Sequence, residues 1–157
     1  MARAVAKELG SSTMPIYSYI KWEWVLIGEL LKRTFKVLDS YMNQKRTGDM
    51  WIDWGVGYVV FSIKEPELFN LIMREHSPMD ESTAQFKHWC TMLEAAEGYV
   101  PFDGLSDEQV EMVLMRRFLF SIGLATHLSR LPKGLLSEAQ IIDLIKGTSL
   151  ALLEGAR

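Results

Sequence analysis

Hydrophobic residues recur at three- and four-residue intervals along most of the chain, which is the spacing of one face of an α-helix. Helices are predicted over residues 50–64, from 66 to near 76, over 84–96, from 106 to about 131 and from 138 to about 154. A longer helix over 22–44 has its inward side at Trp24, Ile27, Leu30, Leu31, Thr34, Phe35, Leu38 and Met42. The pattern therefore predicts an all-α protein.

The last two predicted helices begin with capping boxes. Ser106 precedes Gln109, and Ser137 precedes Gln140, so each serine and glutamine can satisfy free N–H groups of the first turn. Both helices are apolar on more than one side, and a second apolar side needs a partner outside the subunit. We therefore expect a homodimer built from four such helices, with an interface at Val113, Phe120, Leu124, Ile142, Ile145 and Leu153.

The first nineteen residues have the pattern of a helix-turn-helix. Small apolar residues at 2, 5, 6 and 9 form one stripe, Gly10 ends the helix, and Pro15 fits the first turn of a second helix. The same spacing also fits a helical hairpin without a partner. In a DNA-binding unit, phosphates and base edges would be contacted by Ser11, Ser12, Thr13, Tyr17, Tyr19 and Lys21.

Two motifs resemble the TetR family of transcriptional regulators. Ala-Lys-Glu-Leu-Gly followed by Ser-Thr-x-Pro-Ile-Tyr-x-Tyr, within residues 2–20, is similar to the second helix, turn and recognition helix of that family. Residues 54–62 and 65–69 resemble the ligand domain of one TetR subgroup. In that subgroup a later helix carries a Trp followed by His-Gly, and the comparable stretch of this chain, residues 118–123, keeps only Gly123. The resemblance implies a partial DNA-binding head at 1–21, a connecting helix at 22–46, and an effector-binding and dimerisation domain at 47–157.

This chain departs from the family pattern in its head. The family's first helix would precede Arg3, and we expect the sequence to be part of a longer regulator. The family also places a lysine at the start of its fourth helix, where it meets a phosphate, and here that position is Glu23, two residues after Lys21. A carboxylate repels DNA, so the alternative is a helical ligand-binding and dimerisation module that no longer binds DNA.

Large, soft side chains concentrate between residues 50 and 93. Such groups line pockets for apolar ligands, although at helical spacing they also form ordinary cores. Gly55 and Gly57 each cost roughly 1 kcal/mol relative to alanine inside a helix, which indicates that a neighbouring helix or a ligand approaches closely there. For a small apolar effector, the expected binding residues are Trp51, Trp54, Tyr58, Phe61, Met73, Phe86, Trp89 and Met92.

Composition narrows the function classes. The net charge of −3 divides into +4 over residues 1–46 and −7 over 47–157, which suits a protein that meets a polyanion at one end. The hydrophobic runs are too short for a membrane span, and the single Cys90 forms no internal disulfide, so a cytoplasmic protein is expected. His88 and Cys90 have the wrong helical spacing for one metal ion, and no catalytic constellation is present; we expect no cofactor and no enzyme activity.

Overall fold

The structure is a computed structural model that describes residues 2–8, 10, 23–74, 84–132 and 134–157. The elements in these ranges are helices, and no strand occurs among them, so the predicted all-α class is confirmed. They are α1 (Ala2–Glu8), α3 (Glu23–Met42), α4 (Met50–Lys64), α5 (Pro66–Arg74), α6 (Ala84–Ala95), the 3₁₀ helix η1 (Val100–Phe102), α7 (Asp107–Leu128) and α8 (Glu138–Glu154).

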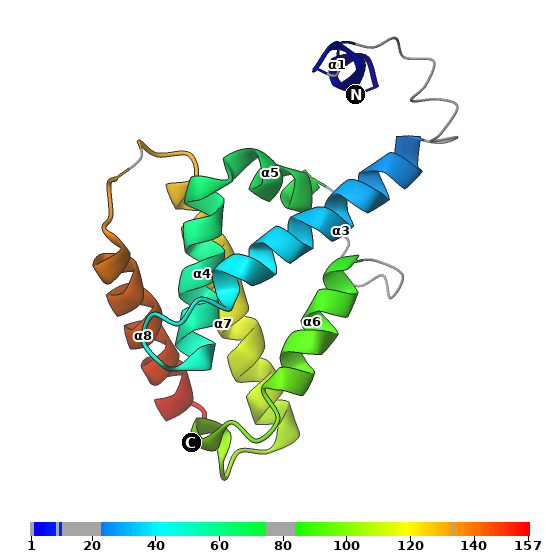
Figure 1. The fold of residues 1–157 in the computed structure, drawn as a ribbon. Helices are drawn as coiled ribbons and strands as arrows, with labels where there is room; N and C mark the ends of the chain where they lie inside the picture. Colours follow the sequence, from blue (N-terminus) through cyan, green and yellow to red (C-terminus); the bar gives the residue numbers. More distant parts are fainter. Residues whose placement is uncertain (1, 9, 11–22, 75–83, 133) are drawn as a thin grey trace.

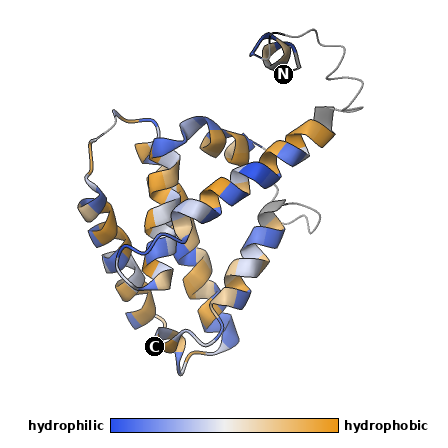
Figure 2. Cartoon of the chain, in the orientation of Figure 1, coloured by the Kyte–Doolittle hydropathy of each residue, from blue (hydrophilic) through white to orange (hydrophobic). Residues whose placement is uncertain are grey.

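Helix α4 lies at the centre of the body. It packs against α3, α5, α7 and α8, and Figure 1 shows it surrounded by these helices. Every residue from 51 to 62 is buried, which explains why this helix is apolar on all sides. Figure 2 shows hydrophobic segments along α4, α7 and α8. Since α4 is the common neighbour, its side chains define the interior of the body.

Two glycines of α4 allow close packing. A Cβ at Gly57 would lie 2.5 Å from both the Met42 Cα and the Tyr41 carbonyl oxygen, so the end of α3 crosses α4 backbone to backbone. A Cβ at Gly55 would overlap Nη1 of Arg117 and lie 2.9 Å from Ile145. The close approach predicted at both glycines is confirmed. A helix causes it at Gly57, and side chains from α7 and α8 cause it at Gly55.

The connector between α3 and α4 is held by partly buried hydrogen bonds. The Asp53 carboxylate accepts from the backbone N–H of Arg46 at 3.1 Å and from the N–H and hydroxyl of Thr47 at 2.8 and 2.7 Å. Asp49 caps α4 by accepting from the N–H groups of Trp51 and Ile52. The crossing of α3 over α4 is therefore fixed at its C-terminal end.

Both predicted capping boxes are present at the starts of α7 and α8, and these helices begin where the sequence places them. Three of the expected dimer residues, however, belong to the core of the subunit itself. Val113, Ile145 and Leu153 are 1%, 0% and 7% exposed and have no side-chain surface left for a partner. Helices α7 and α8 both pack against α4, and Ile145 lies next to Gly55 of that helix. Phe120, Leu124 and Ile142 are half-buried at the edge of the same core.

Of the predicted head, the structure describes α1 and Gly10. Ala6 is buried, as expected for the inner stripe, and Gly10 has a φ of +59°, the left-handed conformation with which helices commonly end at a glycine. The six predicted DNA-contacting residues, at 11–13, 17, 19 and 21, lie outside the described residues. Within the described ranges, no helix is long and apolar enough to cross a membrane.

Candidate functional site

A cavity of about 340 Å³ lies among α3, α4, α5, α6 and α7. Aromatic and methionine side chains dominate its walls, and few polar groups face it, which is the composition of pockets for small apolar ligands. Its ionisable lining residues are Glu111 of α7, which is exposed, His88 of α6 and Tyr58 of α4. The complete lining is Phe35, Leu38, Tyr58, Ile72, Phe86, His88, Trp89, Met92, Glu111, Met115, Phe118, Leu119 and Ile122.

Helix α6 forms one wall of this cavity. It packs on α3, and its Trp89 ring meets Phe118 of α7 with the ring centroids 5.1 Å apart. Phe118 also contacts Tyr58 of α4 edge to face, at 6.2 Å between centroids, and Tyr58 contacts Phe69 at 5.9 Å. Aromatic pairs in this geometry gain energy beyond the apolar area they bury. The rings of Tyr58, Trp89 and Phe118 in the cavity wall are therefore connected, and Phe69 of α5 packs against Tyr58.

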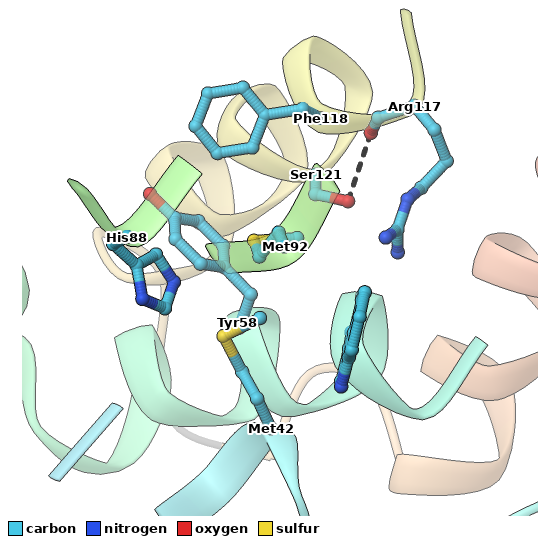
Figure 3. Close-up of a pocket in the computed structure, with 9 residues that line it drawn as sticks. Met42, Tyr58, His88, Met92, Arg117, Phe118 and Ser121 are labelled. Atoms are coloured by element: carbon cyan, nitrogen blue, oxygen red, sulfur yellow. Dashed lines mark hydrogen bonds between the residues drawn. The ribbon is translucent and has the colours of Figure 1, made fainter. Parts of the chain in front are cut away.

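A second, much smaller pocket of about 20 Å³ adjoins the large one. It has room for a single water-sized group. Four residues line both spaces, Tyr58, His88, Met92 and Phe118. The small pocket alone is lined by Met42, Trp54, Gly55, Arg117 and Ser121. Figure 3 shows Arg117 and His88 on opposite sides of this space, with Met92 and Tyr58 between them.

Arg117 is the most unusual residue of the site. Its side chain is 3% exposed, and its Nε and Nη1 have no hydrogen-bond partner among the described residues. The guanidinium carbon lies 5.3 Å from the centre of the Trp51 ring, within the range of a cation–π interaction. Burial lowers the pKa of Arg117 to about 10, which still leaves the group charged at neutral pH.

His88 lies at the opposite end of the small pocket. Its Nδ1 is 3.3 Å from the carboxylate of Asp39 on α3, and its ring contacts Phe35. Burial lowers the pKa of His88, and the nearby Asp39 carboxylate partly opposes that shift. The balance keeps the imidazole neutral at pH 7, so Arg117 is the charged group in the walls of the small pocket.

Tyr58 contributes a neutral polar group to both spaces. Burial raises the pKa of its hydroxyl above the ordinary value of a tyrosine, so no negative charge develops there at physiological pH. The site therefore offers rings, thioethers, a neutral phenol and imidazole, the carboxylate of the exposed Glu111 and one buried guanidinium. This set can bind an apolar molecule, and the described residues include no cluster of three metal-ligating side chains.

The predicted ligand-binding residues fall into three groups. Tyr58, Phe86, Trp89 and Met92 line the large cavity, and Trp54 lines the small pocket. Trp51 and Phe61 do not face either space. Trp51 packs against Tyr99 and Phe102, and Phe61 packs against Tyr41. Met73 is half-buried against the core. Phe61 and Trp51 face other helices because α4 is surrounded by them on every side.

The sequence pattern missed the walls supplied by α3 and α7. Phe35 and Leu38 were predicted as inward positions of their helix, but not as cavity residues. The burial of Arg117 could be inferred from its spacing, because it follows Leu114 by three positions and precedes Ser121 by four, on the buried side of α7. A charged residue at an inward helical position rarely stays buried without a function or a partner.

Comparisons of the chain with protein-family models, with curated proteins and with solved structures gave no match.

Proposed function

We propose that the chain is a TetR-like, homodimeric transcriptional regulator that binds operator DNA through its N-terminal helix-turn-helix and responds to a small, mainly apolar effector. The observation that carries the proposal is the cavity of about 340 Å³ among the helices in which the sequence predicts a ligand site. Its volume falls at the lower end of the range for small-molecule pockets. The helix-turn-helix motif is the basis for proposing DNA binding, and the ligand-domain motif agrees with the same family.

The position of α3 between the predicted DNA-binding head and the cavity supports the same proposal. Helix α3 begins directly after the predicted head and contributes Phe35 and Leu38 to the cavity wall. Helix α3 thus extends from the residue after the segment 1–22 to the cavity wall. A ligand that prefers one position of α3 would shift DNA affinity by a coupling free energy of about 1–3 kcal/mol.

The outer sides of α7 and α8 support the homodimer. Leu144 and Leu150 of α8 are 42% and 50% exposed, and Met112 of α7 is also exposed. Gly123 and Gly147 lie within these helices, and a Cβ at either would meet nothing within 4 Å. A second subunit that packs closely on the exposed apolar side of α7 and α8 would account for glycines at these two positions.

A gel-shift assay tests the DNA-binding part. The chain is mixed with the DNA upstream of its own gene at low salt, and we expect retardation that weakens steeply as salt rises, because phosphate contacts release counterions. Tyr19→Ala and Lys21→Ala should weaken binding, whereas Lys36→Ala, an exposed lysine of α3, should not. Absence of retardation by the unaltered chain at low salt would contradict DNA binding.

The second candidate is a ligand-binding and dimerisation module without DNA binding. The observation that favours it is Glu23, an acidic residue where the family pattern places a phosphate-contacting lysine. Glu23→Lys separates the two functions. If the unaltered chain fails to retard DNA while E23K gains binding, the head has the right shape and has lost a contact.

A further inference from the structure

Arg117 is a buried cation that has no ion-pair partner among the described residues. Charged side chains are almost never fully buried unless they are paired, because removing them from water is costly. Among the described residues, no carboxylate forms an ion pair with Arg117, and its Nε and Nη1 donate to no acceptor. The chain therefore holds a positive charge and two unsatisfied donors in its interior.

The neighbouring groups only partly compensate for this charge. The Trp51 ring offers its π face at 5.3 Å. The nearest electrostatic partners are Tyr99 and Asp49, which raise the pKa of Arg117 but are outweighed by burial. The Asp49 carboxylate already accepts a hydrogen bond of 2.6 Å from the Tyr99 hydroxyl and caps α4. An acceptor supplied by a ligand or by water would satisfy the Nε and Nη1 donors that these groups leave unpaired.

The lack of a side chain at residue 55 leaves space for the guanidinium of Arg117. Gly55 has no side chain, and any Cβ at that position would collide with Nη1 of Arg117. The absence of a side chain keeps the guanidinium at the edge of the small pocket, which shares four lining residues with the large cavity. Figure 3 shows the Arg117 side chain extending from α7 toward the ring of residues around this pocket. A molecule in the large cavity therefore lies one layer of side chains away from an unpaired cation.

We propose that the ligand of this cavity is an amphipathic anion, whose apolar body fills the large cavity and whose single carboxylate or similar anionic group pairs with Arg117. The inference rests on the effector cavity of the proposed function and names the chemical class of the effector. A carboxylate matches a guanidinium in shape and charge, and charge-assisted hydrogen bonds are the strongest that a buried Arg can form.

The dimensions set the size of this ligand. A cavity of roughly 150 Å³ accommodates benzene, so the volume of about 340 Å³ accommodates a body about twice that size. The small pocket now holds only a water-sized group, and the anionic head enters when the side chains between the two spaces move. Met42 and Met92 are among its walls, and unbranched thioethers change rotamer more readily than branched side chains.

Calorimetric titration with two probes of equal chain length tests the proposal. Decanoate and 1-decanol share the apolar body and differ in the charged head, and acetate supplies the head without the body. At pH 8 we expect the chain to bind decanoate at least tenfold more tightly than 1-decanol, and to bind acetate far more weakly than either. Equal affinity for decanoate and 1-decanol would overturn the inference and leave the apolar cavity intact.

Variants of Arg117 identify the charge that recognises the head. Arg117→Met should remove the preference for decanoate while retaining 1-decanol binding, and Arg117→Lys should keep part of the preference. Arg116→Met, at the exposed neighbouring position, is the matched control and should behave as the unaltered chain. Retention of the decanoate preference in R117M would overturn the proposal.

Stability gives a second readout. Because R117M removes an uncompensated buried charge, its melting temperature should equal or exceed that of the unaltered chain, and decanoate should raise the melting temperature of the unaltered chain more than that of R117M. A large drop in the melting temperature of R117M would show that Arg117 is paired within the protein and would contradict the proposal. Failure of all probes to bind would overturn the effector cavity as well, whereas a failed gel shift with intact decanoate preference would reject only DNA binding.

Discussion

Asp53 shows how one buried carboxylate organises the connector between α3 and α4. Burial by itself would raise the pKa of Asp53, but hydrogen bonds from the Thr47 hydroxyl and from the backbone N–H groups of Thr47 and Arg46 hold it below its usual value. The folded-state pKa is thus lower than the unfolded one. The stabilising contribution is complete above pH 4 or so and is lost as the pH falls through the folded-state pKa.

Asp53→Asn tests this account. The amide keeps the shape but turns one acceptor into a donor facing N–H groups, so the free energy of unfolding at pH 7 should fall by about 1–3 kcal/mol. The difference between D53N and the unaltered chain should shrink as the pH is lowered below about 4 in urea unfolding experiments. Asp143→Asn, on the exposed side of α8, is the control and should change little. A difference that stays constant with pH would show that the charge of Asp53 is irrelevant.

At the scale of elements, the crossing of α3 and α4 depends on Gly57. Gly57→Ala places a methyl group against the backbone of Met42 and Tyr41, which cannot move aside as a side-chain end can. Overpacking of this kind costs about 1–3 kcal/mol or more. Gly28→Ala, where a Cβ meets nothing within 4 Å, should instead stabilise α3 by about 0.5–1 kcal/mol. Thermal unfolding followed by circular dichroism measures both, and equal effects would contradict the packing account.

The helices themselves could be predicted from the sequence because their signals are local. Capping residues and glycines mark where helices begin and end, and α4 and α8 have the predicted bounds. The identity of the cavity walls could not be predicted in the same way. Whether Phe61 meets another helix or a cavity depends on which helices lie around α4, and periodicity along one helix does not specify its neighbours.

Val113 and Ile145 illustrate the same difficulty on α7 and α8. The sequence shows that these helices have wide apolar faces, but the sides that meet α4 are set by the packing of the whole body. In the structure Val113 and Ile145 are buried in the core, whereas Leu144 and Leu150 are exposed. Arg117 was identifiable in principle, because its spacing from Leu114 and Ser121 places it on the buried face.

At the scale of the whole molecule, Gly147 tests the homodimer. In a monomer, Gly147→Ala should stabilise α8 by up to about 1 kcal/mol through helix propensity. In a dimer packed at that position, G147A should weaken association, because the added methyl group occupies the approach of the second subunit. Light scattering after size exclusion, over a range of concentrations, distinguishes the two. We expect the unaltered chain to be a dimer and G147A to have a higher dissociation constant. A monomeric unaltered chain would contradict the homodimer.

The way in which the C-terminal end of α3 is held affects how the rest of that helix can move. Gly57 holds Met42 against α4, and the Asp53 hydrogen bonds fix the connector that follows, so this end acts as a fulcrum. At a rise of about 1.5 Å per residue, the cavity residue Phe35 lies roughly 10 Å from Met42 and the start of the helix lies close to 30 Å away. If α3 pivots about this end, a displacement at Phe35 is amplified about threefold at the start of the helix. A ligand that displaces Phe35 by the width of one bond would move the other end of α3 by the width of an atom.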